Sequence, residues 1–233
     1  WFYMAELTAD ISKQYTILYS MNRYLNWWFQ FKRDTKTGLI TSYFEESFTC
    51  GFDVHANEMA ACDTNAAVYV GANLTAKLAA QLSKYDIELQ AIDKANMLKE
   101  SIQKYLYSYD DKTFYNYMVK SGAHRKIAAS NMFDMLRMDI ATETQKLDLI
   151  KKLTNDETFG FGSLGLTSIS KKDPHFTVVK GEYTNLSWDG GIWTMKNMMI
   201  IKGLEESGFY EEAAVLVLQT LNEFNENWGE FLD

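Results

Sequence analysis

The sequence is poor in cysteine, histidine and proline, and it contains no long apolar run. Only 2 Cys, 3 His and 1 Pro occur among its 233 residues. Two cysteines, Cys50 and Cys62, are too few for a disulfide framework; one bridge or two free thiols both remain open, so the cellular compartment is not determined. A run of about eighteen apolar residues is absent, which excludes an ordinary membrane-spanning helix.

Several functional motifs are also missing. The three histidines, His55, His124 and His175, are scattered and show no zinc-ligand spacing with Cys or Asp. Neither a glycine-rich phosphate loop nor a Gly-x-Ser-x-Gly elbow occurs. The chain carries 31 acidic and 23 basic side chains, a net charge of −8, and its basic residues do not cluster. Nucleic acid is therefore excluded as a partner, because phosphate binding needs clustered Lys and Arg.

What the sequence has instead is apolar and aromatic side chains. With 47% hydrophobic and 15% aromatic residues, the chain is suited to fold as one large domain or as part of a larger one. Aromatic rings stack on sugars, but they also fill protein cores, so both interpretations stay open at this level.

The apolar pattern predicts pairs of inner and outer helices. Residues 4–31 carry apolar side chains at helical spacing. Residues 63–82 leave almost no polar face, which is typical of a buried helix, whereas residues 86–107 show one apolar stripe with Asp86 as the expected N-cap. A buried helix followed by an amphipathic one indicates an α-hairpin in a two-layer helical ring.

The same alternation recurs further along the chain. Residues 129–138 begin another buried segment, and Thr142 with Gln145 forms a capping-box pattern ahead of a second outer helix. Residues 190–204 are nearly all apolar, with their methionines expected in the core, and residues 209–224 are amphipathic. We therefore expect an all-α fold.

Short strands and long loops are expected at the rim of this helical fold. Residues 114–118 favour a short strand because three of them are aromatic. The loop 155–188 holds the only proline, Pro174, and a loop of that length is more often a binding loop than filler. The turn acids Asp110 and Asp111 are candidate ligands for a calcium ion, although such acids are usually solvated; no other metal or cofactor is expected.

Several short motifs occur in an order that matches a known group of enzymes. They are Gly51-Phe52-Asp53 with Asp63-Thr64-Asn65-Ala66, Gly165-Leu166-Thr167-Ser168-Ile169-Ser170 with Asp173, Trp188-Asp189-Gly190-Gly191-Ile192-Trp193, and Glu226-Asn227-Trp228. Through these motifs, over about residues 40–230, the chain resembles glycoside hydrolase family 63, which includes processing α-glucosidase and mannosylglycerate hydrolase, and the related trehalases. The resemblance implies an α/α toroid of six helical hairpins with a funnel at one end, and inverting hydrolysis of α-glycosides.

The resemblance also implies a catalytic pair and a sugar pocket. Asp53 matches the family's general acid, and Glu226 is the best match for its general base. Spacing alone would instead make Asp53 a turn residue and Glu226 one of many surface acids. The implied pocket residues are Phe52, Asp63, Asn65, Trp188, Asp189, Gly190, Trp193 and Trp228.

The sequence departs from the family at three places. Thr49 stands where the family often has Glu, the Arg that usually follows the acid has no counterpart in residues 54–57, and Asp189 stands where Arg is common, although trehalases also carry Asp there. A pocket without that cation and carboxylate binds a different sugar or has lost activity. The alternative hypothesis is therefore a catalytically impaired toroid module that binds carbohydrate or a protein partner.

The number of predicted helices bears on the domain organisation. The implied toroid has six hairpins and so twelve helices, whereas the pattern indicates roughly seven. We therefore expect residues 1–233 to form a single α/α-toroid catalytic domain that lacks its N-terminal part. A missing segment or another chain would complete the ring around a small carbohydrate substrate.

Overall fold

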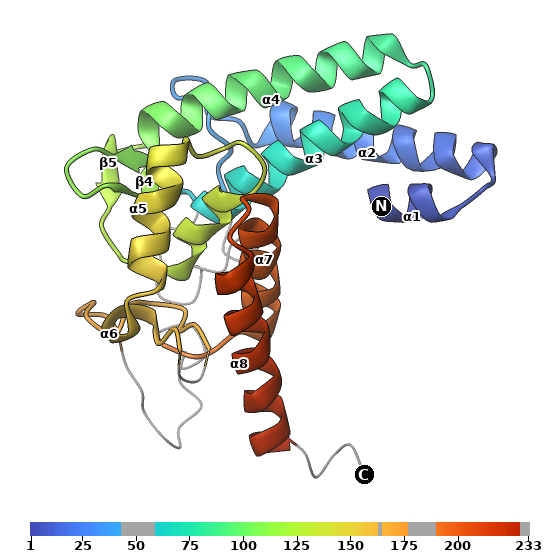
Figure 1. The fold of residues 1–233 in the computed structure, drawn as a ribbon. Helices are drawn as coiled ribbons and strands as arrows, with labels where there is room; N and C mark the ends of the chain where they lie inside the picture. Colours follow the sequence, from blue (N-terminus) through green and yellow to red (C-terminus); the bar gives the residue numbers. More distant parts are fainter. Residues whose placement is uncertain (43–58, 163–164, 177–189, 229–233) are drawn as a thin grey trace.

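The computed structural model describes residues 1–42, 59–162, 165–176 and 190–228, apart from the side chains of 223, 224 and 226–228. Helices make up most of these ranges (Figure 1). They are α1 (Phe2–Leu7), α2 (Ile11–Phe31), α3 (Cys62–Gln81), α4 (Tyr85–Tyr105), the 3₁₀ helix η3 (Ser130–Leu136), α5 (Glu143–Leu153), α6 (Asp156–Phe159), α7 (Thr194–Glu206) and α8 (Tyr210–Trp228).

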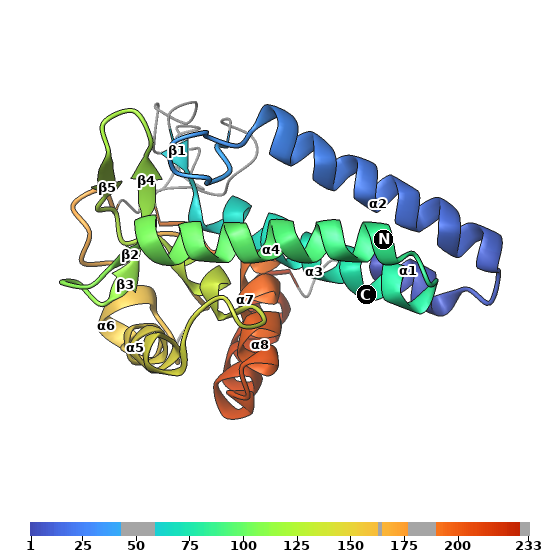
Figure 2. The ribbon, with the colours of Figure 1, turned by 90° about the horizontal axis from the view of Figure 1, so that it is seen from above.

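The α3–α4 pair is the hairpin that the sequence predicts. The two helices run side by side in both views (Figures 1 and 2). Most residues of α3 are buried, whereas α4 buries only one stripe that includes Ala91, Ala95 and Leu98. The expected N-cap was wrong by two residues: the cap position is Lys84, and Asp86 lies in the first turn, where a carboxylate still complements the helix dipole.

The N-terminal helical pattern is interrupted once. Residues 4–31 were expected as continuous helical spacing, but the chain breaks between α1 and α2 because the side chain of Asp10 accepts hydrogen bonds from the N–H groups of Ser12 and Lys13. Such an N-cap requires non-helical backbone at Asp10 itself. In the aromatic cluster of α2, Trp28 is buried, whereas Trp27 is 38% exposed.

Short strands lie beside the start of α3. In the described ranges, β1 (Met59–Ala60), β4 (Asn116–Met118) and β5 (Ala123–Arg125) form one antiparallel sheet, and β2 (Tyr107–Ser108) pairs with β3 (Thr113–Phe114). The predicted strand at 114–118 is therefore confirmed, divided between β3 and β4. The β1–β4 pairing places the side chain of Asn116 to accept a 2.9 Å hydrogen bond from the N–H of Cys62, which fixes where α3 begins.

The second half of the chain packs on α3 through η3. Every residue of η3 is buried, and the predicted capping box of Thr142 and Gln145 is present at the start of α5. The loop expected over 155–188 contains the short helix α6. The prediction that the α7 methionines lie in the core was wrong, since Met195 and Met198 are 58% and 66% exposed.

One large core joins these elements. Buried side chains from α2, α3, α4, η3, α5, α7 and α8 form a single cluster, and a smaller cluster holds α1 against the ends of α2 and α3. None of the helices in the described ranges is both long and apolar enough to span a bilayer.

Candidate active site

The two predicted catalytic carboxylates lie outside the described side chains. Asp53 and its neighbour Phe52 are outside the described residues, as are Trp188 and Asp189. Glu226 belongs to α8, together with Trp228, but the side chains of both are outside the described part. Their catalytic and binding roles therefore stay predictions, and the site must be built from Asp63, Asn65, Gly190 and Trp193.

Asp63 and Asn65 both lie in the first turn of α3. Asp63 is 8% exposed, and its carboxylate accepts a 2.9 Å hydrogen bond from the N–H of Thr64. Asn65 is fully buried. Its side-chain oxygen accepts from the N–H of Ile40, and its amide nitrogen donates to the carbonyls of Ile40 and Ala61, at 2.8–2.9 Å. This geometry makes Asn65 an anchor for residue 40, and the sugar contact that the sequence predicts for it stays a prediction.

Two of the sequence motifs lie next to each other in space. The N–H of Ser168 donates to the carbonyl of Gly191 at 2.9 Å, and Thr167 pairs with Ile192 as an antiparallel bridge. On its other side the same segment pairs with the start of η3, since Ser130 donates to Ser168 at 2.8 Å. The segments around 130, 168 and 191 therefore form a small backbone ladder at the N-terminal end of α7.

Gly165 allows this ladder to approach α7 closely. Its φ is +101°, and a Cβ built at this position would lie 3.1 Å from the side-chain nitrogen of Asn197 and 3.2 Å from Ile192. A side chain at 165 would therefore be strained by its backbone and crowded by its neighbours. The ladder leads into Trp193, which is half-buried and occupies the N-cap position of α7.

A cluster of buried titratable side chains lies where α3, η3 and α7 meet. Asp134 of η3 forms an ion pair with Lys196 in the first turn of α7, and the side chains are only 6% and 4% exposed. Asp63 and Cys62, at the start of α3, are within electrostatic range of this pair. The predicted sugar contact Asp63 is therefore linked to the helix that begins after Trp193.

Burial dominates the electrostatics of this cluster. It raises the pKa of the Asp134 carboxyl; Lys196 opposes that shift, and the negative charge of Asp63 adds to it. Burial also raises the pKa of the Cys62 thiol well above its usual value, and Asp63 and Asp134 add to the effect. Cys62 is therefore a neutral, buried free thiol and not a nucleophile at neutral pH.

Sequence reasoning missed Asp134 and Lys196. Each is a single charged residue within an apolar stretch, Met132–Leu136 in one case and Met195–Ile201 in the other. Charged side chains are rarely fully buried unless they are paired. This rule could have indicated that Asp134 and Lys196 each have a partner of opposite charge, but it could not have identified that partner.

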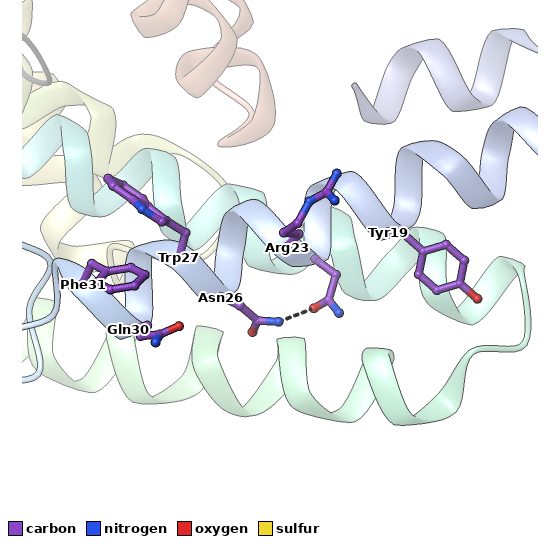
Figure 3. Close-up of a pocket in the computed structure, with 7 residues that line it drawn as sticks. Tyr19, Arg23, Asn26, Trp27, Gln30 and Phe31 are labelled. Atoms are coloured by element: carbon purple, nitrogen blue, oxygen red, sulfur yellow. Dashed lines mark hydrogen bonds between the residues drawn. The ribbon is translucent and has the colours of Figure 1, made fainter.

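A groove of about 330 Å³ lies elsewhere, along one face of α2. Figure 3 shows its lining, in which amide side chains and Arg23 lie among the rings of Tyr19, Trp27 and Phe31. All of these residues come from one helix, and none of them is a predicted site residue. The groove is therefore separate from the candidate active site.

Side chains that bind metals do not gather in the described part of the chain. Among its residues, no group of three or more His, Cys, Asp or Glu side chains is arranged to hold a metal ion. Of the two candidate calcium ligands, Asp111 accepts from Lys126 at 2.8 Å and from the hydroxyl of Ser108 at 3.0 Å. Its carboxylate thus has two protein partners, one next to the turn and one just after β5.

Solved structures of glycosidases share this fold. The mannosylglycerate hydrolase of glycoside hydrolase family 63 from Thermus thermophilus, in complex with glucose, superposes with a TM-score of 0.62 at 19% identity, over 72% of this chain and 38% of that one. Neutral trehalase Nth1 from Saccharomyces cerevisiae gives 0.65 at 17% identity, over 81% and 35%. A sialidase structure gives 0.75 at 15% identity, over 89% and 20%. At such identities these likenesses show the fold alone, that of the α/α-toroid glycoside hydrolases.

Sequence comparison supplies the family. No curated protein sequence matches the chain. The model of the mannosylglycerate hydrolase MGH1-like glycoside hydrolase domain matches residues 4–231, almost the whole chain, while the chain spans well under half the length of the solved relatives given above. The chain therefore belongs to the family of MGH1-like glycoside hydrolase domains.

Proposed function

We propose that this chain is the catalytic part of an inverting glycoside hydrolase that cleaves an α-glucosidic or related α-glycosidic bond. Asp53 protonates the leaving oxygen, and Glu226 removes a proton from the attacking water. The observation that carries the proposal is the family match over residues 4–231. The neighbours' names, a mannosylglycerate hydrolase seen with glucose and a trehalase, favour a small sugar as the substrate.

The geometry of the described residues supports a sugar pocket at the N-terminal end of α7. The ladder of residues 130, 168 and 191 joins two motifs that the sequence singles out, and it leads into Trp193. Asp63 lies at the start of α3, and both α3 and α7 pack on η3. An aromatic ring and a carboxylate both suit a sugar, since the ring covers apolar C–H faces and the carboxylate accepts from hydroxyls.

The single toroid domain is part of the same proposal. Asp53 and Glu226 are far apart in sequence, so they face each other across a sugar only if the helices curve into a closed ring. The exposed apolar side chains of α7 and α8, such as Met195, Met198 and Leu218, are consistent with further helices that complete the ring.

Hydrolysis of a panel of α-glycosides tests the proposal. The panel includes trehalose, mannosylglycerate and aryl α-glucosides. The variants are Asp53→Asn and Glu226→Gln, with Glu211→Gln, an exposed acid on the same helix, as the matched control. We expect each catalytic variant to lower kcat by about 10²–10⁴-fold, the usual contribution of a general acid or base. NMR of the first-formed product should show the β-anomer, the stereochemical mark of inversion at an α-bond.

The alternative function has its own outcome in this experiment. Thr49 stands where the family often has Glu, and Asp189 stands where Arg is common, although trehalases also carry Asp there. If the protein binds sugars by calorimetry but hydrolyses none of the panel, the binding module is correct and the enzyme is not. A hydrolase whose kcat is unchanged in both catalytic variants would keep the reaction and reject the proposed pair.

A further inference from the structure

Two ion pairs join η3 and the residue that follows it, Arg137, to α7, one near each end of α7. Lys196 in the first turn pairs with Asp134, and Glu206 in the last turn accepts two hydrogen bonds from Arg137, at 2.8 and 3.1 Å. The pairs differ in their surroundings. The side chains of Arg137 and Glu206 are each 19% exposed, whereas those of Asp134 and Lys196 are almost completely buried.

The buried pair lies in a place that stability alone does not favour. A lysine in the first turn of a helix opposes the helix dipole. Removing both charges from water is costly, and apolar residues of similar size at such a pair are often equally stable or more so. In some proteins, however, a buried ion pair fixes the relative position of the elements that carry it, because each charge is satisfied in one arrangement only. The Asp134–Lys196 pair is therefore suited to hold α7 in a fixed position relative to η3.

The elements that this pair fixes carry the predicted sugar contacts. Lys196 lies three residues after Trp193, and the N–H of Asn197 donates to the carbonyl of Trp193 at 2.9 Å. Asp134 belongs to η3, which packs on α3, and Asp63 at the start of α3 is close enough to influence the carboxyl of Asp134 electrostatically. The path from Trp193 to Asp63 thus runs through the first turn of α7, the Asp134–Lys196 ion pair and the packing of η3 on α3.

We propose that the Asp134–Lys196 pair is a positioning device for the sugar pocket, which holds the first turn of α7 and Trp193 in place relative to Asp63. The inference rests on the proposed function for the pocket itself. Neither Asp134 nor Lys196 is a catalytic residue here, since each acts through a neighbour. Trp193 and Asp63 are the groups that meet the sugar.

The test replaces the whole pair by apolar side chains of similar length, as Asp134→Leu with Lys196→Met. The double variant removes both charges of the pair together, so it should fold and unfold within a few degrees of wild type. Lys196→Arg, which keeps the charge, is the rescue variant. The matched control is Arg137→Met with Glu206→Met, which removes the pair that joins the same two elements at the far end of α7.

Three readouts are compared in these variants. Hydrogen exchange is followed at the amides of Ser168 and Asn197, which bond to Gly191 and Trp193. Calorimetry gives the Kd for glucose, and hydrolysis of the best substrate gives kcat/KM. For the buried-pair variant we expect exchange at both amides to be at least tenfold faster, with Kd at least tenfold weaker and kcat/KM at least tenfold lower. Lys196→Arg and the control pair should stay within threefold of wild type on all three.

The possible outcomes separate this inference from the proposed function. A folded buried-pair variant with wild-type exchange, Kd and kcat/KM overturns the positioning role and leaves the hydrolase proposal intact. If the control pair gives the same losses, the effect is general loosening of α7, and the inference is wrong. If wild type neither binds nor hydrolyses any sugar, the proposed function fails, whereas the exchange at Ser168 and Asn197 still decides whether the pair positions α7.

Discussion

Replacing Asn65 by alanine distinguishes a structural anchor from a sugar contact. The substitution removes three hydrogen bonds of 2.8–2.9 Å, two to Ile40 and one to Ala61. At about 1 kcal/mol each, their loss costs roughly 3 kcal/mol, and the stranded N–H of the fully buried Ile40 adds about 1–2 kcal/mol. The expected total of about 4–5 kcal/mol is a large share of the ~5–15 kcal/mol by which domains are stable.

Urea unfolding measures this effect. For a slope near 2 kcal/mol per molar, the midpoint of Asn65→Ala should fall by about 2 M with an unchanged slope. Asn73→Ala is the matched control, because Asn73 lies on the same helix and makes one half-buried hydrogen bond to the carbonyl of Tyr69. That control should lose at most about 1 kcal/mol. If Asn65→Ala unfolds like wild type but binds glucose more weakly, the anchor is refuted and Asn65 returns to the pocket.

Three further substitutions follow from the described contacts. Glu206→Gln should cost about 1.5–3 kcal/mol at pH 7. Burial would raise the pKa of Glu206, but its hydrogen bonds to Arg137 lower it overall, so wild type loses this contribution as the pH falls through the lowered pKa. The thermal midpoints of the two proteins should therefore converge in acid. Gly165→Ala should lose more stability in urea, by about 1–3 kcal/mol, than Gly162→Ala, because both have positive φ but only Gly165 is crowded. Thr142→Ala should cost about 1 kcal/mol in thermal unfolding, and Thr142→Ser should restore most of it.

The helical layout was predictable because it depends on local pattern. The α3–α4 hairpin was predicted from residues 63–82, which are apolar on all faces, and from the single apolar stripe of the segment that follows. The start of α5 was predicted from the spacing of Thr142 and Gln145. The break before α2 was missed although its signal is also local. The side chain of Asp10 accepts hydrogen bonds from backbone N–H groups at the start of α2 and so ends the helical pattern before it. Apolar residues nevertheless continue at helical spacing on both sides of this break.

The candidate site was predictable only in part, because its contacts connect distant segments. The sequence singled out the segments of Ser168 and Gly191 as motifs of one family, and the structure joins them by a hydrogen bond. The role of Asn65 was not visible, since an amide at the start of a helix can face a ligand or the backbone equally well. Asp134 and Lys196 lie far apart in sequence, and no local pattern indicates which buried charge neutralises which.

The methionines of α7 show what an apolar pattern does and does not predict. The pattern correctly placed α7 on an inner surface, because Ile200 and Leu204 are fully buried in the main core. It also predicted burial of Met195 and Met198, which remain largely exposed among the described residues. Apolar side chains all round a helix indicate that each face suits contact with another surface, but they do not say where that surface comes from. A side chain becomes buried only when two surfaces pack together. An apolar helix face therefore predicts that this face can pack, but it does not predict which surface packs on it.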